Sequence, residues 1–270
     1  MSGLTFTLRH APDQRLDLSG LVVSRLAGLG ESAIAALPIG TTREGLVVGD
    51  IFAVSGSDAG DIRFVGGSER FDRIGEGQAE GRILVEGDVG QRAGRAMTAG
   101  TLQIRGSAGP FAGSGMSGGT LTVTGDAGDD LGGPLAGEMA GLRGGTVNVL
   151  GSAGARAGHR MRRGVVRIGG SAGPNAGAQM IAGTIVIGGR AARGAGMLMK
   201  RGTIVLAGGA DATGPTFLDN GPADLLILRL MARTFASEPF ARPLFDGSPM
   251  RRLAGDTAVS SQGEIFLPLD

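Results

Sequence analysis

The chain is 270 residues long, carries a net charge of +1 and contains 53 glycines but no cysteine, tryptophan or tyrosine. The small net charge excludes an overall field that attracts nucleic acid or a membrane surface, and the lack of cysteine excludes disulfides and thiolate metal sites. A hydrophobic fraction of 41% is too high for a disordered chain.

The first 45 residues show no internal repetition. Residues 1–11 lack the charged start and apolar centre of a signal peptide, and no stretch of the chain approaches the roughly 18 consecutive apolar residues of a membrane span. We therefore expect a cytoplasmic protein with no membrane association. Residues 1–45 are predicted to form an N-terminal cap, in which Arg15–Leu37 is an irregular apolar segment.

Residues 46–210 contain a repeat whose usual period is 19 residues. The glycines that open successive repeats are spaced by 19, 19, 26, 19, 19 and 19 residues, so one repeat carries an insertion within Asp129–Met139. A fixed period near 20 residues indicates a solenoid, and an insertion in such an array is expected to protrude as a loop that contacts partners. The opening glycines are Gly81, Gly100, Gly119, Gly145, Gly164, Gly183 and Gly202.

Each repeat predicts one short strand. Counted from the opening glycine as position 0, positions +2 and +4 are apolar and position +3 varies, as in Leu102, Gln103 and Ile104. This alternation is typical of a strand with one buried face. Further glycines at +6, +9 and +13 fit chain corners that need positive φ. Alanine at +8 and methionine at +16 predict internal columns, with Gln78 and Leu142 replacing methionine in two repeats.

The predicted fold class is therefore all-β. The expected architecture is a right-handed parallel β-helix of about 19-residue coils, with the irregular N-terminal cap at one end and a C-terminal helix at the other. The hand follows from the usual right-handed sense of parallel crossovers. The three segments 1–45, 46–210 and 211–270 are expected to form a single domain overall.

Residues 211–270 are predicted to hold the C-terminal helix and an extended tail. Asn220–Asp224 resembles a helix start, and Leu225–Phe235 is dense enough in apolar residues either to cap the last coil or to dock a partner protein. The segments Glu238–Pro249 and Glu264–Pro268 are expected to run as an extended arm along the coils or onto a neighbour.

Motifs for catalysis or metal binding are weak. Gly113–Gly118 matches the dinucleotide pattern GxGxxG, but these glycines are corner positions of the repeat and no helix follows them. The two histidines, His10 and His159, are interpreted as surface residues, and Asp126–Asp130 as a loop with solvated acids. We therefore predict no catalytic, cofactor-binding or metal-binding residue in this chain.

Basic residues concentrate in the later repeats. Since one coil advances by only about 4.8 Å, residues one or two coils apart can share a surface. The hypothesis is a patch that holds an acidic partner surface or a polyanionic ligand, and the alternative is ordinary solvated arginines on outward corners. Its members are Arg156, Arg160, Arg162, Arg163, Lys200 and Arg201. His159, Arg167, Arg190 and Arg193 lie close to them in the sequence.

The repeat Gly100–Gly119, GTLQIRGSAGPFAGSGMSGG, resembles the glycine-rich repeat of two protein groups. These are the family of C-type subunits of formylmethanofuran dehydrogenases and the C-terminal domain of the glutamate synthase large subunit. The segment Val48–Gly56 is similar to the region before the repeats in the C-type family. Ala11–Gly20 and Phe217–Pro222 are most similar to the branch found in formyltransferase/hydrolase complexes of methylotrophs.

The resemblance implies a non-catalytic scaffold subunit of a hetero-oligomer in one-carbon metabolism, on the route of formaldehyde oxidation. In such a complex, a formyltransferase subunit moves a formyl group from tetrahydromethanopterin to a methanofuran-type cofactor, and a metal-dependent hydrolase subunit releases formate. The resemblance implies no cofactor bound by the C-type subunit itself.

Two other functions remain open from the sequence. The first is the C-type subunit of a tungsten- or molybdenum-dependent formylmethanofuran dehydrogenase, which has the same architecture and which the residues of this chain do not separate from the hydrolase branch. The second is a stand-alone β-helix enzyme acting on polysaccharides. Such an enzyme needs clustered acids or a basic catalytic residue in a groove and usually aromatic subsites, which a chain with ten phenylalanines and no tryptophan or tyrosine does not favour.

Overall fold

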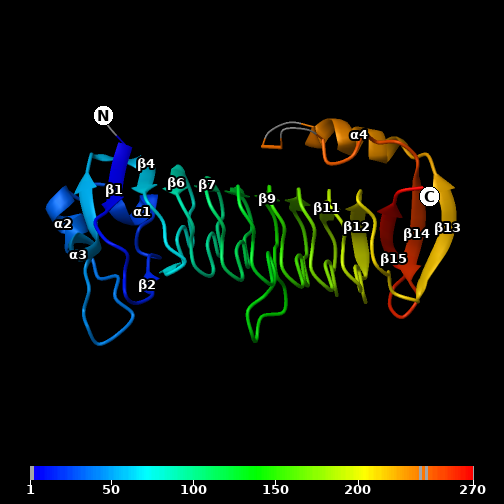
Figure 1. Ribbon diagram of the computed structural model, residues 1–270, viewed down its shortest axis with the longest axis horizontal. Coiled ribbons are helices and arrows are strands. Elements are labelled where there is room, and N and C mark those ends of the chain that lie inside the picture. The colour runs from blue at the N-terminus through cyan, green and yellow to red at the C-terminus, as the bar shows by residue number, and fades with distance from the viewer. Residues whose placement is uncertain (1–2, 237–238, 241–242, 270) are drawn as a thin grey trace.

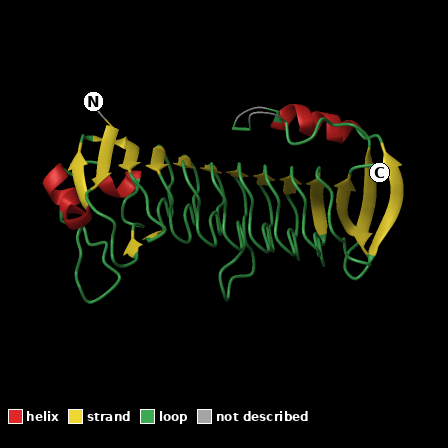
Figure 2. Cartoon of the chain, viewed as in Figure 1, coloured by secondary structure: helices red, strands yellow, loops and turns green. Residues whose placement is uncertain are grey.

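The computed structural model describes residues 3–236, 239–240 and 243–269. The described chain is mostly β, with one large, mostly parallel sheet of 13 strands and a C-terminal helix (Figures 1 and 2). The order in the sheet is β13-β14-β15-β12-β11-β10-β9-β8-β7-β6-β4-β1-β3.

The repeats supply the central strands of this sheet. Neighbouring repeats pair in parallel and in register, so that Thr101 lies beside Thr120, and Thr120 beside Thr146 across the insertion. The predicted strand positions are confirmed, because the apolar residues at +2 and +4 are buried. These strands are β4 (Asp58–Val65), β6 (Arg82–Glu86), β7 (Thr101–Ile104), β8 (Thr120–Val123), β9 (Thr146–Val149), β10 (Val165–Ile168), β11 (Thr184–Ile187) and β12 (Arg201–Leu206).

A second parallel ladder runs through the alanines at +8. Each residue forms an isolated bridge with its counterpart in the next repeat, from Val89 and Ala108 as far as Ala191 and Ala210. The methionines at +16 are fully buried, and so are Gln78 and Leu142 in the same position. One apolar core therefore runs along the repeats between the two ladders.

Some corner glycines are required by close approach of the backbone. A Cβ atom on Gly118 would lie 2.0 Å from the carbonyl oxygen of Thr98 in the preceding repeat. Since real contacts of a Cβ atom are essentially never that short, this corner excludes every residue that carries a side chain.

The N-terminal segment covers the first repeat by joining the sheet. Strand β1 (Gly3–Leu8) pairs in parallel with β4 and antiparallel with β3 (Phe52–Ser55). Phe6 stacks on Phe64 with ring centroids 4.7 Å apart. The predicted irregular segment Arg15–Leu37 contains two short helices. The small elements here are β2 (Leu16–Asp17), α1 (Val23–Leu26), α2 (Glu31–Ala35), α3 (Val48–Ile51) and β5 (Phe71–Asp72).

Three strands that lie outside the repeat cover the last strand of the repeats, β12. Strand β15 (Gln262–Leu267) pairs in parallel with β12, β14 (Met250–Asp256) pairs antiparallel with β15, and β13 (Phe217–Ala223) pairs with β14. The predicted helix start at Asn220–Asp224 is therefore wrong, because residues as far as Ala223 belong to β13 and α4 (Leu226–Phe235) begins after them.

Helix α4 packs on the outer face of the sheet and does not cap the last strand. Leu228 is fully buried together with Val186, Val205 and Phe266. The two valines occupy position +3, which faces away from the core of the coils. Figure 1 shows α4 above the row of central strands, on the side opposite the insertion loop. Of the tail Glu238–Pro249, residues 238, 241 and 242 lie outside the described part of the chain.

Candidate functional site

The candidate site is built on one column of residues. Each member lies two positions before the glycine that opens the next repeat. Every member donates its backbone N–H to a carbonyl of the preceding repeat. Arg162 bonds the carbonyl of Leu142 at 2.7 Å and Lys200 bonds that of Met180 at 2.8 Å. The column reads Thr98, Ser117, Arg143, Arg162, Ile181 and Lys200 along the coils. Its chemistry therefore changes at the insertion, from small hydroxyl residues to large basic and apolar ones.

The adjacent column continues this pattern. It reads Ala99, Gly118, Gly144, Arg163, Ala182 and Arg201. Together the two columns form an open groove of about 410 Å³ between exposed guanidinium groups. Its lining residues are Arg143, Arg162, Arg163, Ile181, Ala182 and Arg201.

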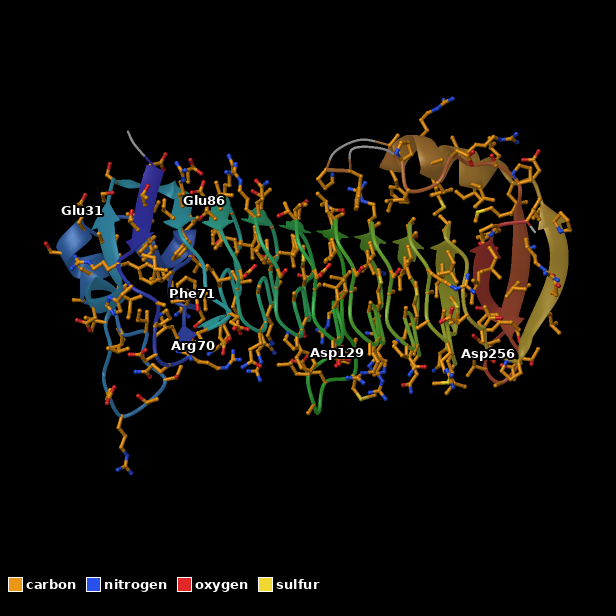
Figure 3. All side chains as sticks on the ribbon, viewed as in Figure 1. Glu31, Arg70, Phe71, Glu86, Asp129 and Asp256 are labelled. Atoms are coloured by element: carbon orange, nitrogen blue, oxygen red, sulfur yellow. The ribbon has the colours of Figure 1, made fainter. Side chains whose placement is uncertain are left out.

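A second groove of about 280 Å³ adjoins the first, since Ile181 lines both. It contains apolar side chains from three parts of the chain, and Met139 from the insertion is 79% exposed. Its lining residues are Met139, Arg160, Gln179, Ile181, Leu198, Lys200 and Val259. We call the two grooves together the basic-apolar groove. Figure 3 labels Asp129 on the edge of the molecule from which the insertion descends.

The basic residues of this groove form no described ion pair, and the acid that interacts with Arg143, Glu138, is itself paired with Arg95. None of the ion pairs in the described part of the chain involves Arg143, Arg160, Arg162, Arg163, Lys200 or Arg201. Arg160 donates from Nε to Oε1 of Gln179 at 2.8 Å, which orients the guanidinium without cancelling its charge. Elsewhere arginines are paired, as Arg95 is with Glu76 at 2.9 Å.

Arg156, the first member of the predicted patch, lies outside both grooves. Its guanidinium donates two hydrogen bonds to the buried carboxylate of Asp130, at 2.8 and 2.5 Å. The hydrogen bond and charge of Asp130 raise the pKa of Arg156. Asp130 thus neutralises Arg156, and the groove takes the other five predicted residues, Arg160, Arg162, Arg163, Lys200 and Arg201.

Two further arginines that are near these in sequence lie elsewhere. Arg167 is on the outer face of the sheet, where it donates to Asn148 at 2.8 Å and lies 5.2 Å from the ring centroid of Phe240. Burial lowers the pKa of Arg167. Arg190 pairs with Asp211 at 2.5 Å. Proximity in sequence does not place these arginines together, because successive residues of a repeat face different sides.

The other candidates from the sequence do not line the groove. His10 is exposed, whereas His159 is half-buried and its Nδ1 lies 3.9 Å from Asp130. Asp126 and Asp129 accept hydrogen bonds from backbone N–H groups of the next coil, at 2.7 and 2.8 Å. Among the described residues, no group of three or more histidine, aspartate or glutamate side chains is placed to hold a metal ion.

The GxGxxG motif also belongs to the coil interior. Met116 and Ser114 are fully buried, and Gly113 and Gly115 have φ of 68° and 65° at the corner. The motif is therefore part of the structural repeat.

The groove residues that sequence reasoning missed include Arg143, Met139, Leu198 and Val259. Arg143 was detectable, because it holds the same repeat position as Arg162 and Lys200. The others come from the insertion, from a corner and from the C-terminal segment, and only the packing of the coils brings them together.

Comparison with known proteins relates the chain to one complex. It matches a chain in the X-ray crystal structure of the formyltransferase/hydrolase complex (FhcABCD) from Methylorubrum extorquens in complex with methylofuran. The TM-score is 0.92 and the identity 42%, over 98% of this chain and 100% of that chain.

A curated relative agrees with this match. The chain is 44% identical over 88 residues to the C-type subunit of the formyltransferase/hydrolase complex Fhc of Methylorubrum extorquens strain AM1. That match spans about a third of each protein, 33% of either length. No family model matches the chain. Within the described residues, none of the helices has the length and apolar character needed to cross a bilayer.

Proposed function

The chain belongs to the family of C-type subunits of formyltransferase/hydrolase complexes, and we propose that it is a scaffold subunit of such a complex without catalytic residues of its own. Under this proposal, other subunits transfer the formyl group from tetrahydromethanopterin to a methanofuran-type cofactor and hydrolyse the product to formate. This chain holds those subunits in place and binds neither cofactor. The lack of cysteine fits a reducing compartment, which we propose to be the cytoplasm.

The observation that carries the proposal is the match over 98% of the chain at 42% identity to a component of that complex. The arrangement of side chains supports the non-catalytic part. Half-buried His159 contacts Asp130 and lies beside Arg156. A general base also needs a nucleophile or substrate proton within about 3 Å, and none of the hydrogen bonds described for this histidine involves a hydroxyl group.

We also infer how the repeats wind. Each repeat contributes one strand to the parallel sheet and one residue to the alanine ladder. The methionine of the repeat is buried in the core between them. Two parallel ladders visited once per repeat are what a parallel β-helix requires. The usual hand of parallel crossovers makes it right-handed. In this geometry residues 46–210 form the rod, and residues 1–45 and 211–270 form its two ends.

The test is an activity assay on separated subunits. The purified chain is expected to release no formate from formyl-tetrahydromethanopterin, alone or with a methanofuran-type cofactor. Adding it to the other subunits is expected to restore the assembled complex. Formate release by the isolated chain would overturn the non-catalytic role, and co-purification with molybdopterin or iron–sulfur subunits would assign it to a dehydrogenase complex instead.

A further inference from the structure

We propose that the basic-apolar groove binds an acidic segment of a partner protein of the complex, in which an apolar side chain sits among Met139, Ile181 and Leu198. This inference rests on the proposed function, because it assumes that the chain works within a complex. It goes further by naming the surface and the chemistry of the segment that occupies it.

Like charges lie close together in the groove. Arg162 bonds the residue next to Arg143 in the preceding coil, and stacked coils are about 4.8 Å apart. Like charges on neighbouring strands destabilise a fold. Elsewhere this chain relieves such contacts with acids, as when Arg95 bonds Glu76 and Glu138. At the groove, Glu138 interacts with the charge of Arg143 but is already paired with Arg95. No described ion pair includes Arg162, Arg163 or Arg201, so a partner that supplies carboxylates would relieve the remaining repulsion.

Three groove residues share one corner conformation. Arg160, Gln179 and Leu198 hold the same corner position in successive coils, with φ of 51°, 54° and 58°. In another coil this position is Gly115, with φ of 65°. A residue with a side chain in this region costs about 1 kcal/mol relative to glycine. The same position holds Ala96, with φ of 54°, in a repeat away from the groove, so the corner itself requires no large side chain. Arg160, Gln179 and Leu198 each place one there, and all three line the groove.

The groove also has exposed apolar side chains in its lining. Met139 is 79% exposed and Leu198 is 37% exposed, and both border the same groove as Ile181. A small polyanion gains nothing from apolar contacts, and single-stranded nucleic acid is bound partly by base stacking on aromatic side chains, which the groove lacks. Carboxylates beside an apolar anchor match both parts of the lining. A polypeptide segment supplies this combination.

The experiment measures the affinity of the chain for the remaining subunits of its complex at two salt concentrations. Arg162→Glu/Arg163→Glu is expected to weaken assembly at least about tenfold at low salt, and Met139→Ser to weaken it at both concentrations. Arg160→Gly removes a groove charge while relieving backbone strain, so it should fold at least as well as the wild type and still bind less tightly. The matched control is Arg25→Glu/Arg43→Glu, an equal charge change on exposed residues at the N-terminal end.

Each outcome decides the proposal. Weakening by all groove variants, with an unchanged control, supports it. Wild-type affinity in the groove variants would overturn it while leaving the scaffold function intact. An effect of the charge variants without an effect of Met139→Ser would also overturn it, in favour of a small polyanion. Failure of the wild-type chain to assemble at all would instead refute the proposed function.

Discussion

Two separate physical constraints determine which residue type a corner of the repeat accepts. They are close approach of the backbone and positive φ. Gly118 shows the first, since its Cβ would be 2.0 Å from the carbonyl oxygen of Thr98. Gly115 shows the second, with φ of 65° and open space around it. Different corners therefore require glycine for different physical reasons.

The two constraints predict different losses of stability. Gly118→Ala is expected to lower the free energy of unfolding by on the order of 3 kcal/mol, because the coils must separate. Gly115→Ala should cost only about 1 kcal/mol, and Gly20→Ala, which has open space, within about 0.5 kcal/mol. Urea denaturation measures all three. Equal losses for Gly118→Ala and Gly115→Ala would contradict the packing argument.

His159 predicts a pH dependence. Burial, and after it the charge of Arg160, lower its pKa below the usual 6.5. The folded protein then binds fewer protons than the unfolded chain, so stability is full above about pH 6.5 and falls as the pH drops below it. His159→Gln should flatten the profile of melting temperature below about pH 6.5. A profile that is as steep in His159→Gln as in the wild type would assign it to other groups.

Among the elements, α4 presents apolar residues on two sides. Leu228 is fully buried on the sheet, whereas Leu230 is 47% exposed. Leu228→Ala is expected to destabilise the packing of α4 by about 2 to 4 kcal/mol, and Leu230→Ala by less than about 0.5 kcal/mol. Hydrogen exchange of the α4 amides reports this local opening. Equal protection in the two variants would mean that the helix does not depend on the sheet for its stability.

The insertion gives a second prediction at the element scale. Leu142 donates its backbone N–H to the carbonyl of Gly132 at 2.6 Å, and Met116 makes the same bond to Gly113 in an ordinary coil. Residues 133–139 thus loop out of an intact coil. Deleting them should give a chain with a melting temperature within a few degrees of the wild type. The Arg95–Glu138 pair that is lost is partly exposed and worth at most about 1 kcal/mol. Loss of folding would show that the loop is structural.

The sequence predicted these elements unevenly. The strands of the repeats followed from alternation such as Leu102-Gln103-Ile104, because the period fixed their register as well as their existence. Strands β13–β15 were missed as a sheet, since each occurs once and their pairing joins residues far apart. The switch at position +3 from Arg167 to Val186 and Val205 was the available signal for α4. Apolar residues on the outer face require a cover.

The site was predictable to a similar degree. A repeat position places residues reliably in a column, and Arg162, Arg163, Lys200 and Arg201 line adjoining grooves in the structure; their role as a patch stays a prediction. Within one coil the direction of each side chain depends on the corner conformation. That is why Arg156 was expected in the patch and instead pairs with Asp130.

At the scale of the whole molecule, the described chain is one large, mostly parallel sheet with a buried core along the repeats, and its irregular parts line the basic-apolar groove. The ends are closed by β1 and β3 on one side and by β15, β14 and β13 on the other. The basic-apolar groove is the place where an insertion, several corners and the C-terminal segment meet. This arrangement suits a protein that acts by holding others.

Native mass spectrometry of the tagged chain purified from its own cells tests this account most directly. The scaffold function predicts one stable species that contains this chain together with larger subunits, including a formyltransferase and a metal-dependent hydrolase. A monodisperse species with the mass of the 27.0 kDa chain alone would contradict it.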